Sequence, residues 1–301
     1  WTGRHFSPSK CADMAKVTEK CFEESGRPCF ICDFSPPRSG DGLVLQNADI
    51  PADFISIAYN PGRAVRVNSA MLAAAIKQHS GMDTIFTLAT RDMNKLALQS
   101  QMLGAQVLDL ENVVVVQGDP FGQRDQGVVK EVGDTHPTQF IAALRAMNQG
   151  IDFRGSQLRS PTSFCIGATA DLGRDTDQEA ALAVRKVEAG AEFFMTQPIF
   201  DVAEADKFLD SYRSKSGTDL SVPVFYGLQI MEKDGVIFSS VPESVREELE
   251  KGRSGVEIAL ELYRRFREHG LNNAYLMPPI RRGGARNYEA AQQVLAASKS
   301  L

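Results

Sequence analysis

The stretch Gly190-Ala191-Glu192-Phe193-Phe194-Met195-Thr196-Gln197-Pro198-Ile199-Phe200-Asp201 decides how this chain folds. It predicts a helix that ends at Gly190, a short buried strand over 192–196, and a loop that starts on Thr196 and Gln197. A glycine at a helix end followed by an apolar run is typical of a parallel strand covered on both faces. Polar residues where such a strand ends either cap the loop or belong to an active site, because parallel α/β enzymes place their chemistry there.

Strands of this kind alternate with helices along the whole chain. Strands are expected over 29–34, 53–59, 84–89, 112–117, 163–168, 192–196, 222–228 and 273–278. Helices are expected over 69–79, 93–103, 137–149, 178–189, 203–214, 242–250, 255–268 and 287–297, and segment 229–241 is short and irregular. The pattern predicts an α/β fold, a single closed (β/α)8 TIM barrel. A doubly wound open sheet is the alternative, although Ser35-Pro36-Pro37 follows the first strand where that fold has a glycine-rich turn.

The length and charge of the chain limit its organisation and its partners. The 301 residues suit one catalytic barrel domain at 29–301 after an N-terminal extension at 1–28, in which a short amphipathic helix is expected. A net charge of −5 argues against nucleic acid or an anionic membrane as the main partner. No apolar run approaches the ~20 residues of a membrane span and no signal peptide is recognised, so a cytoplasmic location is expected. The sequence leaves open a homo-oligomer or a redox partner subunit.

The cysteines and histidines do not predict a metal centre. The pair Cys29 and Cys32 has the spacing of metal ligands, but apolar residues separate the two and no second tight pair follows. Reduced cysteines in the core of a strand are the better interpretation. The four histidines, at 5, 79, 136 and 269, lie in the N-terminal extension or next to expected helices. A metallohydrolase or a Ser-His-Asp hydrolase is therefore not expected, and no metal ligand is assigned.

Two aspartates stand where expected strands end, and in a barrel the loops after all strands converge on one mouth. Asp33 lies in an apolar run, so it is either paired with a barrel-lining arginine or functional as a general acid. Asp119 follows Gly118 and can accept hydrogen bonds from a heterocycle, or it forms an Asx turn before Pro120.

A glycine pair follows the eighth expected strand. Gly283-Gly284 precedes a helix and has arginines nearby, at 281, 282 and 286. This arrangement is either the phosphate cradle common in barrels or a plain flexible loop. The residues alone leave both alternatives open.

Taken together and in this order, the motifs resemble those of the methylenetetrahydrofolate reductase family. The match includes Cys32–Arg38 at the first strand, Ile55–Tyr59 at the second, Leu88–Asp92 and Leu96–Gln101 at the third, and Val115–Pro120 at the fourth. Its most specific part is Lys186–Ala191 leading into Thr196–Asp201. The resemblance extends from about residue 29 to residue 296.

The resemblance implies an oxidoreductase that interconverts 5,10-methylenetetrahydrofolate and 5-methyltetrahydrofolate by hydride transfer through FAD, with NAD(P)H as electron donor, a step of methionine biosynthesis. It implies that Asp33 is the general acid that protonates folate, that Asp119 faces pterin and flavin, and that Gln197 contacts folate and nicotinamide in turn. Phe200 would stack on a substrate ring. The implied cofactor-binding residues are Tyr59, Thr87, Gln117, Gly118, Asp119, Ala168, Glu179, Arg185 and Lys186.

Several positions differ from the family pattern. Asp33 replaces the motif glutamate and is one methylene shorter, and Thr87 replaces a histidine that touches flavin. Ala58 replaces a threonine and Gln117 replaces an arginine, so weak retention of FAD is expected. Two other functions are therefore kept open: a flavin-independent folate-linked one-carbon oxidoreductase of the same fold, and a folate-binding accessory subunit without catalysis.

Overall fold

The strands form a closed parallel barrel. The computed structural model describes residues 15–23, 27–237 and 241–301. Each strand pairs with the next, and β1 pairs with β8 to close the barrel. The strands are β1 (Phe30–Phe34), β2 (Phe54–Ile57), β3 (Thr84–Ala89), β4 (Asn112–Val116), β5 (Cys165–Ala170), β6 (Phe193–Pro198), β7 (Val224–Gln229) and β8 (Ala274–Met277). The predicted TIM barrel is confirmed, and the open-sheet alternative is wrong.

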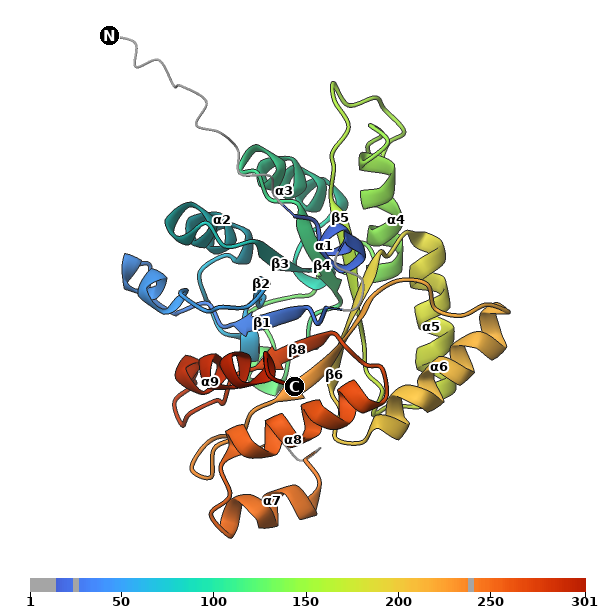
Figure 1. Cartoon of the computed structure of the whole chain (residues 1–301). Helices are drawn as coiled ribbons and strands as arrows, with labels where there is room; N and C mark the ends of the chain where they lie inside the picture. The colour runs from blue at the N-terminus through green and yellow to red at the C-terminus, as the bar shows by residue number, and fades with distance from the viewer. Residues whose placement is uncertain (1–14, 24–26, 238–240) are drawn as a thin grey trace.

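A ring of helices surrounds the strands (Figure 1). The helices of this ring are α2 (Ser69–Ser80), α3 (Lys95–Val107), α4 (Pro137–Met147), α5 (Thr176–Ala189), α6 (Val202–Ser216), α8 (Gly255–Glu268) and α9 (Tyr288–Ser298). Helix α7 (Glu243–Glu250) lies outside α8 (Figure 1). Short 3-10 turns lie at η1 (Gly42–Asn47), η2 (Pro61–Arg63), η3 (Thr90–Asp92) and η4 (Gln123–Asp125). Among the described residues, no helix is long and apolar enough to span a membrane.

Alternate residues of the strands face the inside of the barrel, as the two-residue period requires. The inward-facing apolar side chains form their own buried cluster, separate from the larger one between strands and helices. Its largest buried members are the rings of Phe54, Phe193 and Phe225. The rings of Phe193 on β6 and Phe225 on β7 have centroids 6.2 Å apart. A Cβ at Gly167 would lie 2.3 Å from the ring of Phe193, so only glycine leaves room for this ring.

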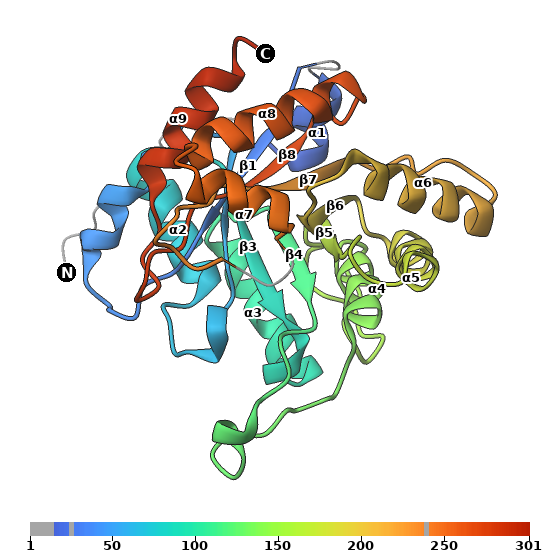
Figure 2. The ribbon, with the colours of Figure 1, turned by 90° about the horizontal axis from the view of Figure 1, so that it is seen from below.

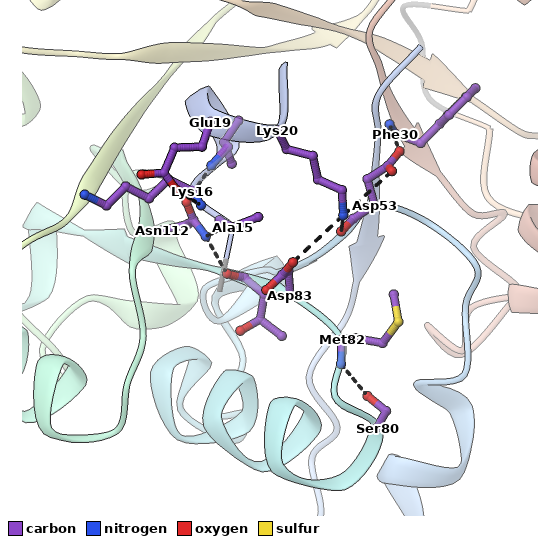
Figure 3. Close-up of polar contacts among 12 residues, drawn as sticks. Ala15, Lys16, Glu19, Lys20, Phe30, Asp53, Ser80, Met82, Asp83 and Asn112 are labelled. Carbon is purple, nitrogen blue, oxygen red and sulfur yellow. Dashed lines mark hydrogen bonds and ion pairs between the residues drawn. The ribbon is translucent and has the colours of Figure 1, made fainter. Parts of the chain in front are cut away.

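Helix α1 (Val17–Glu23) lies at the N-terminal ends of the strands, within the expected extension. The Val17 side chain is fully buried in the interior cluster, and its backbone N–H donates to Asn112 Oδ1 at 2.9 Å. Lys20 lies between Asp53 and Asp83, at 3.8 and 3.9 Å from their carboxylates (Figure 3). Because these partners precede or begin β2, β3 and β4, α1 covers the end of the barrel opposite the expected active site.

The end of β6 differs from the prediction. The strand continues to Pro198, so Thr196 and Gln197 lie in the strand and do not start the loop. Pairing with β7 shifts between Met195 and Pro198, which is a β-bulge. The hydroxyl of Thr196 accepts a hydrogen bond from the Gly227 N–H at 2.8 Å and donates to Gln197 O at 2.8 Å. The Thr196 hydroxyl thus takes the place of a backbone acceptor for the Gly227 N–H, and this bond lets the strand continue past the bulge.

Candidate functional site

A cavity of about 650 Å³ lies at the C-terminal ends of β2 to β6. This volume is in the range of cofactor and small-ligand sites. The strand ends, the start of α4 and one face of α5 form its walls. Its lining includes seven of the residues that the sequence assigned to the site: Tyr59, Gln117, Gly118, Asp119, Glu179, Lys186 and Gln197.

Lys186 provides a buried positive charge on the α5 wall of the cavity. Its ammonium group donates to Thr169 O at 2.6 Å and lies 3.9 Å from the Glu179 carboxylate. Burial lowers the pKa of Lys186, and the nearby negative charge of Glu179 opposes this shift. A buried cation held by one carbonyl and one carboxylate is suited to a further anionic partner.

Gln197 reaches the cavity from the bulge in β6. Its side chain is exposed, although Thr196 beside it is only 2% exposed. Gly227 faces the bulge from β7, and a Cβ at that position would lie 2.5 Å from Gln197 O. The bulge and this glycine together direct the amide of Gln197 into the cavity, a use of bulges that recurs next to active sites.

The turn after β4 carries Gln117, Gly118 and Asp119, and the side chain of Asp119 is exposed at the cavity. Gly118 has a φ of +86°, which favours glycine. A Cβ there would also lie 3.2 Å from Ala89 Cβ and 3.3 Å from Arg91 Cβ. Close packing against Ala89 and Arg91 therefore also requires glycine at position 118, in addition to the contact with the cofactor that the sequence predicted.

Tyr59 takes part in a hydrogen-bonded chain at the β2 and β3 side of the cavity. It shares a hydrogen bond with Asp92, and burial together with the negative charge of Asp92 raises the pKa of Tyr59 to about 12. Asp92 also accepts from Arg91 Nε at 2.6 Å and from Nη2 at 2.8 Å. Burial raises the pKa of Asp92, but the hydrogen bonds from Arg91 and Tyr59 outweigh it and leave this pKa lowered.

Asp33 lies inside the barrel and is not part of the cavity lining. Its Oδ1 accepts a hydrogen bond from the Tyr275 hydroxyl at 2.8 Å, and its Oδ2 lies 2.9 Å from Arg286 Nη2. The carboxylate is therefore paired with an arginine, which is one of the two alternatives that the sequence left open. Burial and the negative charge of Asp33 raise the pKa of Tyr275 well above its usual value, so this tyrosine keeps its proton as a donor.

Four further residues of the predicted site are not in the cavity lining. The Ala168 side chain is fully buried in the cluster between strands and helices, and Arg185 is exposed on α5. Thr87 is half-buried in β3, two residues before the strand ends. Phe200 lines a separate cavity of about 50 Å³ beside Met231 and Gln229.

The glycine pair lies at another cavity, of about 490 Å³, between the loops after β1 and β8. Gly283 and Gly284 have φ values of +93° and +90°. Arg66 and Arg286 reach the same cavity, and Arg286 is the partner of Asp33. The cradle proposed from the sequence therefore lies apart from the 650 Å³ cavity and its residues.

Several cavity residues had no assigned role in the sequence. They are the cationic side chains of Arg63, Arg91 and Arg174, together with Asp171 and His136. Arg91 and Asp171 lie within two residues of the ends of β3 and β5, and this position at strand ends is the signal that could have assigned them to the site. Arg63, Arg174 and His136 lie farther along the loops, where the sequence gives no comparable signal. Among the described residues, no group of three or more His, Cys, Asp or Glu side chains is arranged to hold a metal ion.

Comparison with known families identifies one match over most of the chain. The family model described as methylenetetrahydrofolate reductase matches residues 18–277. This range includes all strands of the barrel and the whole lining of the 650 Å³ cavity.

The curated relatives are distant and longer. Methylenetetrahydrofolate reductase 2 of Schizosaccharomyces pombe is 20% identical over 251 residues, which are 75% of this chain and 37% of that protein. Methylenetetrahydrofolate reductase (NADH) 1 of Arabidopsis thaliana is 20% identical over 281 residues, 85% of this chain and 47% of the relative. The chain thus spans less than half the length of these relatives.

Solved structures support the fold. An uncharacterized protein from Clostridium thermocellum, described as binding two copies of 5-methyl-5,6,7,8-tetrahydrofolic acid, superimposes with a TM-score of 0.66 at 14% sequence identity. The alignment covers 95% of this chain and 100% of that chain. A long-chain alkane monooxygenase gives a TM-score of 0.53 at 11% identity. At these identities the likeness shows the fold alone.

Proposed function

The chain belongs to the methylenetetrahydrofolate reductase family, and from this premise we propose that it interconverts 5,10-methylenetetrahydrofolate and 5-methyltetrahydrofolate with FAD in the 650 Å³ cavity and NAD(P)H as electron donor. The observation that carries the proposal is the meeting of Gln117, Asp119, Glu179, Lys186 and Gln197 around one cavity at the strand ends. The folate described for the structurally similar Clostridium thermocellum protein supports the substrate class.

The donors around the cavity fit a flavin dinucleotide. Lys186 offers a buried ammonium, and the exposed cations Arg63 and Arg174 line the same space. These positive charges suit a diphosphate, which prefers charge-assisted hydrogen bonds. Tyr59, Gln117, Gly118 and Glu179 would complete the contacts on the cofactor, which when bound would supply the hydride chemistry.

The residues of the chain itself would bind and orient the folate. Asp119 lines the cavity and would place a carboxylate near the positive charge that develops on the folate, since preorganised charges stabilise such a charge without reorganisation. Gln197 would hydrogen-bond the ring, held in place by the bulge in β6. Asp33, which lies outside the lining of this cavity, would give a proton to folate only after its ion pair with Arg286 is broken.

Cofactor retention tests this proposal. Because Thr87, Ala58 and Gln117 replace stronger flavin contacts, we expect FAD to bind one per chain but to be lost during extensive dialysis. Lys186→Met should weaken FAD binding by roughly tenfold or more, since a hydrogen bond to a charged group contributes about 1.5–3 kcal/mol. The measurement is quenching of flavin fluorescence on titration with the purified protein.

The control is Lys215→Met, which removes an exposed lysine of α6 that pairs with Asp177. It should bind FAD as the wild type does. Full FAD occupancy after dialysis would contradict the expected weak retention. Equal binding by Lys186→Met and the wild type would place the cofactor outside this cavity.

A further inference from the structure

The loop between β4 and α4 borders the 650 Å³ cavity and extends away from the barrel (green in Figure 2). It carries Asp119 near its start, and its far part contains exposed Arg124 and Lys130. A loop of this length needs anchors if a residue on it is to keep a fixed position at the cavity.

Arg91, in η3 after β3, contacts both ends of this loop through its backbone. Its N–H donates to Gln117 O at 3.2 Å, and its carbonyl accepts from the Val132 N–H at 2.9 Å. The residues 117 and 132 are thereby held at one place on the barrel.

The guanidinium of Arg91 adds contacts to the first turn of the loop. Its Nη1 donates to Asp119 O, and its centre lies 4.0 Å from the centroid of the Phe121 ring. Gly118 lets the turn approach this side chain, because a Cβ there would lie 3.3 Å from Arg91 Cβ, which is tighter than ordinary van der Waals contact.

The charge of Arg91 is already matched within the protein. Its side chain is 5% exposed, and Asp92 accepts two hydrogen bonds from it, at 2.6 and 2.8 Å. A planar guanidinium whose donors are engaged in this way serves to fix geometry, a task in which lysine cannot replace it.

We propose that Arg91 is a positioning residue: its backbone holds both ends of loop 117–132, and its guanidinium clamps the first turn of the loop and so fixes Asp119 at the cavity wall. Its effect on the reaction rests on the proposed function, because it acts through Asp119. Its effect on the loop does not depend on that function.

The first test is limited trypsin digestion of the whole protein, with cleavage after Arg124 and Lys130 followed by mass spectrometry. Arg91→Lys keeps the charge but loses the planar fork, so we expect cleavage in the loop roughly tenfold faster than in the wild type, as for the loss of one charged hydrogen bond. The matched control is Arg154→Lys, which alters another arginine that lies over a ring, Phe153 at 5.3 Å. It should leave cleavage in this loop unchanged.

The second test is a double-mutant cycle on folate turnover with Arg91→Lys and Asp119→Asn. If Arg91 acts through Asp119, the double variant should be no slower than Asp119→Asn alone. The clamp would be overturned if trypsin cleaved the loop of Arg91→Lys no faster than that of the wild type. It would also be overturned if the turnover losses of Arg91→Lys and Asp119→Asn were additive in the double variant. If Arg91→Lys is cleaved faster but the wild-type protein shows no folate turnover, the clamp is supported and the proposed function is contradicted. The two failures are therefore distinguishable.

Discussion

Asp33 is the residue whose role changes most between sequence and structure. An aspartate in an apolar strand predicts either a general acid or an ion pair, and the structure shows the pair with Arg286 together with a hydrogen bond from Tyr275. The sequence could not select these partners, because they lie more than two hundred positions away and reach Asp33 only when β8 closes the barrel on β1. A role as acid therefore requires that substrate binding release Asp33 from Arg286.

Replacing Asp33 tests this role. Asp33→Asn should lose most folate turnover, on the order of 10²- to 10⁴-fold for a general acid, while reduction of bound flavin by NAD(P)H survives. Asp33→Glu restores the side chain of the family motif and should retain part of the activity. Steady-state turnover and stopped-flow flavin reduction separate the two half-reactions.

The same substitution has a structural cost that must be measured beside it. Asp33→Asn leaves Arg286 without a charged partner at a site where its side chain is only 14% exposed, so a loss of about 3 kcal/mol in unfolding free energy is expected. Tyr275→Phe removes one hydrogen bond without changing charge and should cost about 1 kcal/mol. Wild-type folate turnover in Asp33→Asn would show that Asp33 is a structural carboxylate only.

At the scale of elements, the bulge in β6 is the feature that the sequence did not predict. The apolar run and Gly190 located the strand, because burial and helix termination are local properties. The end of the strand was set too early, at Thr196, because a hydrogen bond from a side chain to the neighbouring strand is a tertiary contact. A strand end placed at the first polar residue is therefore too early when the side chain of that residue hydrogen-bonds to the neighbouring strand.

Thr196→Val tests the bulge. The variant keeps the shape of the side chain but leaves the buried Gly227 N–H without its acceptor, so a loss of about 1–3 kcal/mol in unfolding free energy is expected. Because Gln197 follows directly, the KM for folate should rise more than kcat falls. Urea unfolding and steady-state kinetics measure these effects.

Thr84→Val is the matched control for this variant. Thr84 is also buried in a strand, but its hydroxyl has no hydrogen-bond partner in the structure, so its removal should be neutral or stabilising. Equal stability and kinetics for Thr196→Val and the wild type would mean that the hydroxyl does not support the bulge.

At the scale of the whole molecule, the alternation of strands and helices was sufficient to predict the barrel. The barrel topology also brings strand ends together, which is why Gln117, Asp119 and Gln197 could be expected at one site before the structure. Glu179 and Lys186 lie on α5 and were assigned to that site only by the resemblance to the family. Side-chain direction was not predictable in the same way. Ala168 is on β5 as expected but faces the helices, because a shift of one residue along a strand reverses the face.

The central claim is that one cavity holds a flavin that exchanges hydride with folate. The most direct test is an anaerobic spectrum of the FAD-loaded protein during titration with 5-methyltetrahydrofolate, without NAD(P)H. We expect the visible absorbance of the flavin to bleach in a saturable manner, and Asp119→Asn to bind the folate but bleach far more slowly. Saturable folate binding by the loaded wild-type protein with no change in flavin absorbance would contradict it.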